Sequence, residues 1–352
     1  MTATIFHNAR VLTMDPAHPR AAAVFVRDGL IVRVSDHAAS LRRDAPGADE
    51  IDCADAVLAP AFIDAHCHLL ATAARTLSID CSPAAVQSIG DIQRRLREAA
   101  SAAQDGEWLR AAGYDESQLA EQRHPTRRDL DAAVPHHPVR LLHRSGHALV
   151  LNTAALRLAG ITTESAEPPG AAIDRFTDDG SPSGLLFEMN EVVDAVVPRL
   201  PYEALAPAVV ETARRFLATG VTAICDATHT NGREEWELFA RLQADGHLPL
   251  DVTLMEGVDH VGAMPDPEPP EGRDAAHGVG ETASSHARLL RGHVKIMLHE
   301  LGDTLAPDER RLSEIVRDLH ARDRDVAIHA VEPRAVAAAV DAVAAAVAAH
   351  PR

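Results

Sequence analysis

From about residue 202 onward, strand-like apolar runs alternate with helical segments, and this alternation limits the fold more than any other feature. The helical segment 201–220 ends at Gly220, and the apolar run VTAICDA follows it directly. LDVTLMEG, GHVKIML and DVAIHAV are further strand-like runs, and the amphipathic segment PDERRLSEIVRDLHARD separates the last two. Such alternation is typical of parallel strands joined by crossover helices, so we expect an α/β barrel or an open α/β sheet.

The sequence before residue 202 has a different character. Residues 1–57 contain short runs rich in β-branched residues, with turn-forming RDG between two of them, and predict a small β-unit that is too small to stand alone. Later, PVRLLHRSGHALVLNTAALRLAG predicts a strand, a polar turn and a helix. The segment 262–286, rich in Pro, Gly and charged residues, predicts a mobile loop after LDVTLMEG.

Composition excludes some classes of partner. The chain of 352 residues is 46% hydrophobic and has a formal net charge of −18, without the basic stripe that binds nucleic-acid phosphates. It begins without the pattern of a signal peptide, and no apolar segment is long enough to span a bilayer. We therefore expect a cytoplasmic protein that binds neither nucleic acid nor membrane. The cysteines have no CxxC spacing and are expected to be free thiols: Cys53, Cys67, Cys81 and Cys225.

Two histidines end one strand-like run, FIDAHCHL. Residues two apart on a strand point to the same face, so His66 and His68 project together while Cys67 faces the core. In an α/β barrel, functional groups lie at the carboxyl ends of the strands. Two neutral imidazoles on one face suit a divalent ion such as zinc, although a chance HxH is plausible in a chain with 20 histidines.

Two later strands carry residues of matching type. Lys295 lies inside the apolar run GHVKIML, where a bare ammonium group is costly to desolvate, and His329 ends DVAIHAV. Alone, Lys295 also fits a structural ion pair and His329 a hydrogen-bonded core histidine. Together with His66 and His68, they form an ordered set of metal-ligand types on successive strand ends.

At this point the sequence resembles a known family. In this order, the N-terminal β-unit, LAPAFIDAHCHL, GVTAICDA, VKIML and VAIHAV resemble the amidohydrolase superfamily. The segment WLRAAGYDESQLAEQRHPTRRDLDAAVPHHPVRLLHRSGHALVLNTAALRLAGI resembles the long segment of the family-3 amidohydrolases, whose members include an N-substituted formamide deformylase. The resemblance covers essentially the whole chain. It implies a TIM-barrel-like metal-dependent hydrolase fold, with a β-sandwich part over 1–57, a barrel part over 58–352 and an insertion over 71–200.

The resemblance also implies roles for single residues. His66 and His68 match the metal ligands of the first barrel strand, and His329 matches the ligand of the fifth. Lys295 matches the fourth-strand lysine, which in many relatives is carboxylated and bridges two metals, so one or two ions of zinc or another divalent metal are expected. The implied reaction is hydrolysis of a non-peptide carbon–nitrogen bond, in an amide or N-substituted formamide, by a metal-activated water.

The family pattern continues with a sixth-strand histidine and an eighth-strand aspartate, which this sequence does not match. We therefore expect an incomplete barrel of about five of the eight strands, with no residue assigned as the catalytic base. The alternative is a truncated, non-catalytic remnant, or one subunit of a split enzyme with weak metal binding. The expected partners are a small-molecule amide and either a second copy of the chain or a complementing C-terminal chain.

Other polar residues are candidates for a substrate pocket. HRSGHALVLN contributes His143 and His147, although without a GxSxG motif a Ser/His nucleophile is disfavoured. CDATHTNG contributes Asp226 and His229, and the same segment also fits a cap on the next helix through Thr230 or Asn231. Tyr114, followed by Asp115 and Glu116 in GYDES, completes the set.

Overall fold

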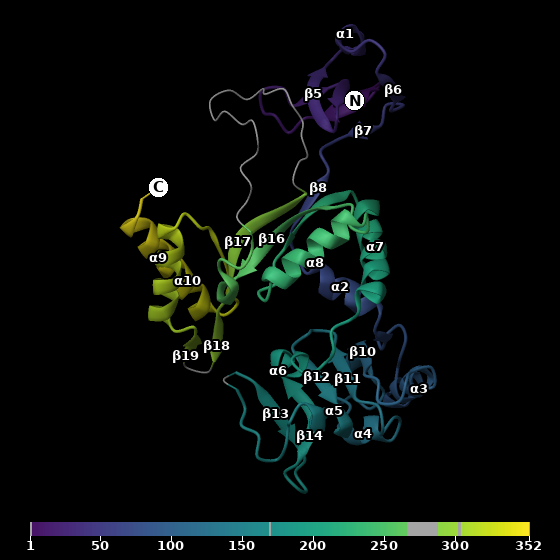
Figure 1. Cartoon of the computed structure of the whole chain (residues 1–352), viewed down its shortest axis with the longest axis vertical. Helices are drawn as coiled ribbons and strands as arrows, with labels where there is room; N and C mark the ends of the chain where they lie inside the picture. Colours follow the sequence, from purple (N-terminus) through teal and green to yellow (C-terminus); the bar gives the residue numbers. More distant parts are fainter. Residues whose placement is uncertain (1, 169, 266–287, 302–303, 352) are drawn as a thin grey trace.

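The computed structural model describes residues 2–168, 170–265, 288–301 and 304–351, and it divides into three sheet-based parts (Figure 1). The N-terminal unit and the sheet of the insertion lie on opposite sides of the barrel strands (Figure 1). The predicted mobile loop 262–286 lies almost entirely outside the described residues.

Two small sheets form the N-terminal unit, with orders β5-β4-β1-β6 and β3-β2-β7. Their elements are β1 (Ala3–His7), β2 (Arg10–Leu12), β3 (Arg20–Ala21), β4 (Ala23–Arg27), β5 (Leu30–Ser35), α1 (Ala38–Asp44), β6 (Asp49–Asp52) and β7 (Val57–Leu58). Ile5 and Phe25 pack with Leu41 of α1 in a small core. The prediction of short strands in this region is confirmed.

A five-stranded parallel sheet forms the barrel part, in the order β20-β17-β16-β15-β8. Its strands are β8 (Phe62–Cys67), β15 (Val221–Asp226), β16 (Asp251–Gly257), β17 (Leu289–Met297) and β20 (Val326–His329). Its helices are α2 (Leu69–Thr76), α7 (Tyr202–Ala218), α8 (Arg233–Ala244), α9 (Glu309–Ala321) and α10 (Pro333–Ala349). The alternation of strand and helix seen in the sequence therefore gives the TIM-barrel-like arrangement expected.

The order of the strands in the sheet follows their order along the chain. The connections that lead into β15, β16 and β20 contain the helices α7, α8 and α9, and α2, α7 and α8 pack with β15 and β16 in one core. Cys67 belongs to this core at 9% exposure, which confirms that it faces away from its histidine neighbours. α7 ends where Gly220 takes φ +83°, as the sequence predicted.

Residues between β8 and α7 form a second, six-stranded sheet in the order β13-β14-β12-β11-β10-β9. Its strands are β9 (Ile79–Asp80), β10 (Leu109–Tyr114), β11 (Val139–His143), β12 (Ala148–Leu151), β13 (Ala172–Arg175) and β14 (Pro182–Phe187). Around it lie α3 (Ile89–Ala100), the 3₁₀ turn η1 (Glu116–Gln118), α4 (Arg127–Asp131), α5 (Thr153–Leu158) and α6 (Asn190–Asp194). All of these elements lie within the predicted insertion 71–200.

The strand β12 was not predicted from the sequence. Its residues lack polar and apolar alternation because both faces of the strand are covered: Val150 packs in one hydrophobic core and Leu149 in another. Antiparallel pairing of Leu141 with Val150 shows that the polar turn in HRSGH closes a hairpin before α5 begins. A single strand followed by a helix was therefore wrong for this segment.

Two apolar surfaces remain exposed among the described residues. β5 exposes Leu30, Ile31, Val32 and Val34, and the two N-terminal sheets border a groove of about 520 Å³. On α10, four valines at helical spacing form a second exposed surface, which we call the α10 stripe: Val336, Val340, Val343 and Val347. At the edges of the barrel sheet, β8 pairs only with β15, and β20 only with β17, within the described residues.

Candidate metal centre

The carboxyl end of β8 presents two imidazoles. His66 and His68 lie on one side of the strand with their ring centroids 5.5 Å apart and their planes at 80°. The Nδ1 atom of His68 lies 2.9 Å from the hydroxyl of Thr228, which follows the neighbouring strand β15. A hydrogen bond at one ring nitrogen fixes the orientation of the ring and leaves Nε2 for a ligand.

The side chain of Asp226 holds the backbone next to these imidazoles through hydrogen bonds. Its Oδ2 accepts a hydrogen bond from the backbone N–H of Leu69 at 2.8 Å, and its Oδ1 accepts one from Thr228 N and one from Asn231 Nδ2. The side chain is buried, at 1% exposure. Asp226, predicted as a pocket residue, thus holds the ends of β8 and β15 together.

The sequence predicted the wrong residue as the N-cap of helix α8. α8 is capped by Gly232, whose N–H donates to the carboxylate of Glu235, rather than by Thr230 or Asn231. The side-chain amide of Asn231 instead donates a hydrogen bond to Asp226.

Lys295 lies on β17, paired with Gly257 on one side and Ala327 on the other. It is 4% exposed, and the described residues give it neither an ion pair nor a hydrogen bond. Burial lowers the pKa of its amine, against a smaller opposing effect of Cys225. It is also the only lysine in the chain, a signal that the sequence alone could have supplied.

His329 ends β20 opposite Met297, two pairs further along the strands than the pair of Lys295 with Ala327. Burial lowers its pKa, and the nearby charges of Lys295, His299 and His66 lower it further, against a raising effect of Glu332. The His299 ring is 6.0 Å from the His329 ring. His299 was missed by sequence reasoning because it lies beyond the strand, in β18 (His299–Leu301), which pairs with β19 (Thr304–Ala306).

The donors come together because the sheet curls. In a flat sheet, β8 and β20 at opposite edges would lie roughly 19 Å apart, given four spacings of about 4.8 Å. Yet the charge of His66 on β8 affects the pKa of His329 on β20. His68 also responds to Lys295: burial lowers the pKa of His68, and His66, Lys295 and His229 lower it further, against Asp226, which raises it.

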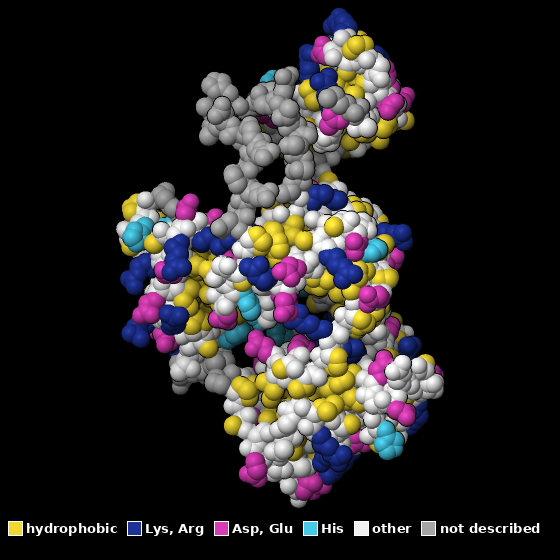
Figure 2. Space-filling view, in the orientation of Figure 1, with side chains coloured by type: hydrophobic (Ala, Val, Ile, Leu, Met, Phe, Trp, Pro, Cys, Tyr) yellow, Lys and Arg dark blue, Asp and Glu magenta, His cyan; other side chains and the backbone are white. Residues whose placement is uncertain are grey.

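Two of the predicted pocket residues, His229 and His147, form ion pairs with glutamates of the insertion. His229, after β15, makes an ion pair of 3.0 Å with Glu191 of α6, which connects the barrel to the insertion. His147 is mostly exposed and pairs with Glu188 at 2.7 Å. In the space-filling view, histidine side chains gather in a hollow between the barrel helices and the insertion, with acidic side chains beside them (Figure 2).

Tyr114 and His143 lie deeper in the insertion. Tyr114 is fully buried, and its hydroxyl lies 2.9 Å from His124 Nδ1. The Nε2 of His143 lies 2.8 Å from Glu116 Oε2. Among the described residues, one group of three ligand atoms of His, Cys, Asp or Glu lies within 4.8 Å of one another. This group consists of Asp115, Glu116 and His143 in the insertion, not of the donors at the ends of the barrel strands.

A curled parallel sheet whose crossovers carry helices defines the chain as an α/β protein of the barrel type. More particularly, the chain belongs to the amidohydrolase family: the family model so described matches residues 49–352. It is 31% identical over 264 residues to an N-substituted formamide deformylase of Arthrobacter pascens, covering 74% of this chain and 48% of that protein. It is 26% identical over 339 residues to the putative amidohydrolase YtcJ of Bacillus subtilis (strain 168), covering 93% of this chain and 63% of that protein.

Solved structures show the same fold. An uncharacterized metal-dependent hydrolase from Pyrococcus horikoshii OT3 aligns with a TM-score of 0.69 at 19% identity, over 97% of this chain and 68% of that chain. A second, from Pyrococcus furiosus, aligns with a TM-score of 0.67 at 20% identity, over 98% and 70%. The chain thus spans about half to two thirds of the length of the proteins it matches. No helix in the described part of the chain has the length and apolar character needed to cross a bilayer.

Proposed function

We propose that this chain carries the metal centre of a hydrolase that acts on non-peptide carbon–nitrogen bonds, in an amide or an N-substituted formamide. The observation that carries the proposal is the convergence of Lys295, buried and unpaired within the described residues, with the imidazoles at two strand ends, those of β8 and β20. The similarity to an N-substituted formamide deformylase supports the choice of bond.

The donor chemistry fits a divalent ion. The lowered pKa values of His68 and His329 keep both imidazoles neutral near pH 7, and only the neutral ring offers a lone pair to a metal. His66, His68 and His329 would hold the ion through nitrogen, a ligand type that zinc favours. When bound, a divalent ion supplies Lewis acidity toward a carbonyl oxygen and makes water more acidic.

Lys295 is suited to carboxylation by CO₂. Its lowered pKa raises the fraction of neutral amine, which is the form that attacks CO₂; the amine nitrogen forms a bond to carbon and loses a proton. The product is an anionic carbamate, so the costly buried cation becomes an oxygen ligand. This conversion gives the lysine the partner that the described residues do not supply.

The substrate would enter between the barrel and the insertion. Here His229 and His147 offer polar contacts and Thr228 keeps the His68 ring in place. With 3% aromatic residues the chain offers little stacking surface, so a small aliphatic amide is favoured over an aromatic polymer.

The partner we propose is a polypeptide that adds further strands to the barrel sheet. The outer edges of β8 and β20 are unpaired within the described residues, and Phe62 and Ile63 of β8 are exposed. The matched relatives contain more chain than the aligned part, which supports a barrel built with further strands.

The test is hydrolysis of N-substituted formamides and simple amides by the chain co-expressed with the C-terminal part of a close relative. We expect turnover that a chelator abolishes and that His329→Ala lowers more than tenfold, since loss of even an indirect metal contact costs about 10- to 100-fold. A soluble, metal-loaded complex that hydrolyses no amide, formamide or cyclic imide would overturn the proposal.

A further inference from the structure

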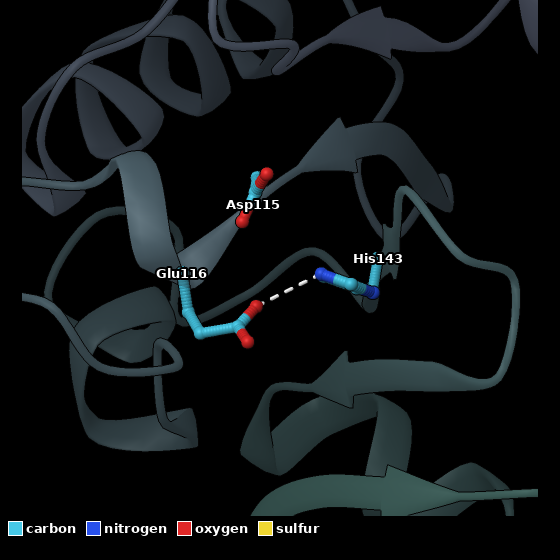
Figure 3. Close-up of side chains that lie close together, drawn as sticks. All are labelled: Asp115, Glu116 and His143. Atoms are coloured by element: carbon cyan, nitrogen blue, oxygen red, sulfur yellow. Dashed lines mark ion pairs between the residues drawn. The ribbon is translucent and has the colours of Figure 1, made fainter.

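A second group of metal-ligand types lies in the insertion, at the carboxyl ends of two neighbouring strands. Asp115 and Glu116 follow β10, and His143 ends β11 (Figure 3). One ligand atom from each residue lies within 4.8 Å of the other two. None of the three belongs to the strand-end donors described above.

A local irregularity of the sheet brings these residues together. β10 and β11 pair in parallel, and their register shifts between Ala112 and Tyr114, so that Tyr114 comes opposite His143. Gly113, inside the shift, has φ +98°, a conformation that side chains other than glycine rarely adopt. The bulge bends the strand end and directs Glu116 toward the imidazole of His143 (Figure 3).

The facing atoms of this group are buried and lack hydrogen bonds. Glu116 Oε2 and His143 Nε2 lie 2.8 Å apart, yet neither atom has a hydrogen-bond partner. Buried polar atoms without a partner are rare in native structures, and an unseen ion is one of their ordinary explanations. The two atoms are thus close enough for an ion pair but lack the geometry of a hydrogen bond.

Neighbouring groups hold the three side chains in place. Asp115, at 7% side-chain exposure, accepts hydrogen bonds from Ser117 through Oδ1 and from Arg144 through Oδ2. The Nδ1 of His143 lies 2.8 Å from the hydroxyl of Ser145 and accepts a hydrogen bond from the backbone N–H of Ser145 at 3.2 Å, and these contacts fix the ring with Nε2 toward Glu116. Arg144 is the competing cation, but it touches only one oxygen of Asp115 and its side chain is 61% exposed.

We propose that Asp115, Glu116 and His143 bind a divalent cation that clamps the ends of β10 and β11. Two carboxylates and one imidazole suit zinc or manganese, which such ligands bind at about 2.0–2.2 Å. The ion would neutralise the second carboxylate, which Arg144 does not reach. This site does not depend on the proposed hydrolytic activity.

The test is direct metal binding by the full chain in which His66→Ala and His68→Ala remove two strand-end donors. Titration with Zn²⁺ and with Mn²⁺ should still show one bound ion, and metal should raise the Tm. Adding Glu116→Gln, which keeps the shape of the side chain but removes its charge, should weaken this binding more than tenfold and abolish the Tm shift. The matched control is Glu188→Gln, because Glu188 also pairs with a histidine, His147, but without a third donor.

Equal metal binding by the Glu116→Gln and control chains would overturn the site and leave a plain Glu–His ion pair. If circular dichroism shows that the His66→Ala/His68→Ala chain is unfolded, the same comparison is made with both strand-end histidines present, where Glu116→Gln should cost one ion per chain. If no ion binds at the barrel strand ends while the insertion site still binds one, the proposed function is wrong and the insertion site stands. The two failures are therefore distinguishable.

Discussion

Asp226 accepts a 2.8 Å hydrogen bond from the backbone N–H of Leu69, the first residue of α2. The bond joins the carboxyl end of β15 to the point where β8 turns into a helix, directly after His68. An anionic side chain at a helix N-terminus also interacts favourably with the helix dipole. The backbone that carries the strand-end imidazoles is thus held by a buried carboxylate.

Asp226→Ala should therefore destabilise the chain. It leaves the N–H groups of Leu69 and Thr228 and the amide of Asn231 without their acceptor, so we expect a loss of about 3 kcal/mol in the free energy of unfolding. Denaturant titration measures this loss. Asp80→Ala, at an exposed carboxylate that accepts from Ser82 N, is the matched control and should cost less than about 1 kcal/mol. Equal losses for the two variants would contradict the positioning role.

Carboxylation of Lys295 predicts a specific NMR signal. Chain incubated with zinc and ¹³C-bicarbonate should show one carbamate carbon resonance, and because Lys295 is the only lysine, its assignment needs no further labelling. Lys295→Arg keeps a positive charge but cannot form the carbamate, and it should lose the signal. A signal of equal strength in the arginine variant, or none in the parent chain at saturating bicarbonate, would show that the lysine stays unmodified.

The lowered pKa values of His68 and His329 predict how stability depends on pH without metal. Below their ordinary value of 6.5, the unfolded chain binds protons at these residues more readily than the folded chain does, so the folded state loses stability as the pH falls. We expect the Tm in chelator to drop from pH 7 to pH 5, and to drop less in the His68→Gln/His329→Gln variant. His18→Gln, at an exposed histidine, should follow the parent profile. Identical slopes for all three chains would contradict the burial of the strand-end imidazoles.

The strands and helices of the barrel could be predicted because their local patterns match their tertiary roles. β15, β16 and β17 are apolar runs that place Ile224, Leu254 and Ile296 in the cores beneath the helices, and α9 carries an apolar stripe that packs against α10. His66 and His68 were placed on one face by strand geometry alone. The sequence left the role of Asp226 open. Its partners Leu69 and Asn231 follow two different strands, and only the parallel pairing of β8 with β15 brings these two turns together.

The cluster of Asp115, Glu116 and His143 in the insertion could not be predicted from the sequence for a related reason. Tyr114, Asp115, Glu116 and His143 were all predicted to line a substrate pocket, but their contact depends on the register shift at Gly113. A shift of register leaves no pattern in the spacing of residues along the chain. β12 was missed because a strand covered on both faces has no alternation to detect.

The α10 stripe predicts a docking surface for added barrel elements. Co-expression with the C-terminal part of a close relative should give a soluble complex, since the unpaired edges and exposed valines would then be covered. Val340→Asp should weaken the complex at least tenfold, because it places a charge in the middle of the apolar contact. Asp341→Asn, the neighbouring residue off the stripe, is the control. Complex formation unaffected by Val340→Asp would place the contact elsewhere.

The central claim is that the strand-end donors hold a metal, and metal content tests it most directly. The comparison is made in chains that all carry Glu116→Gln, so that the insertion cluster does not contribute. After equilibration with zinc and gel filtration, mass spectrometry of the metal should find at least one ion bound to this chain, and the further change of His66 and His68 to alanine should remove it. Zinc bound equally by both chains, or by neither at micromolar concentrations, would contradict the account.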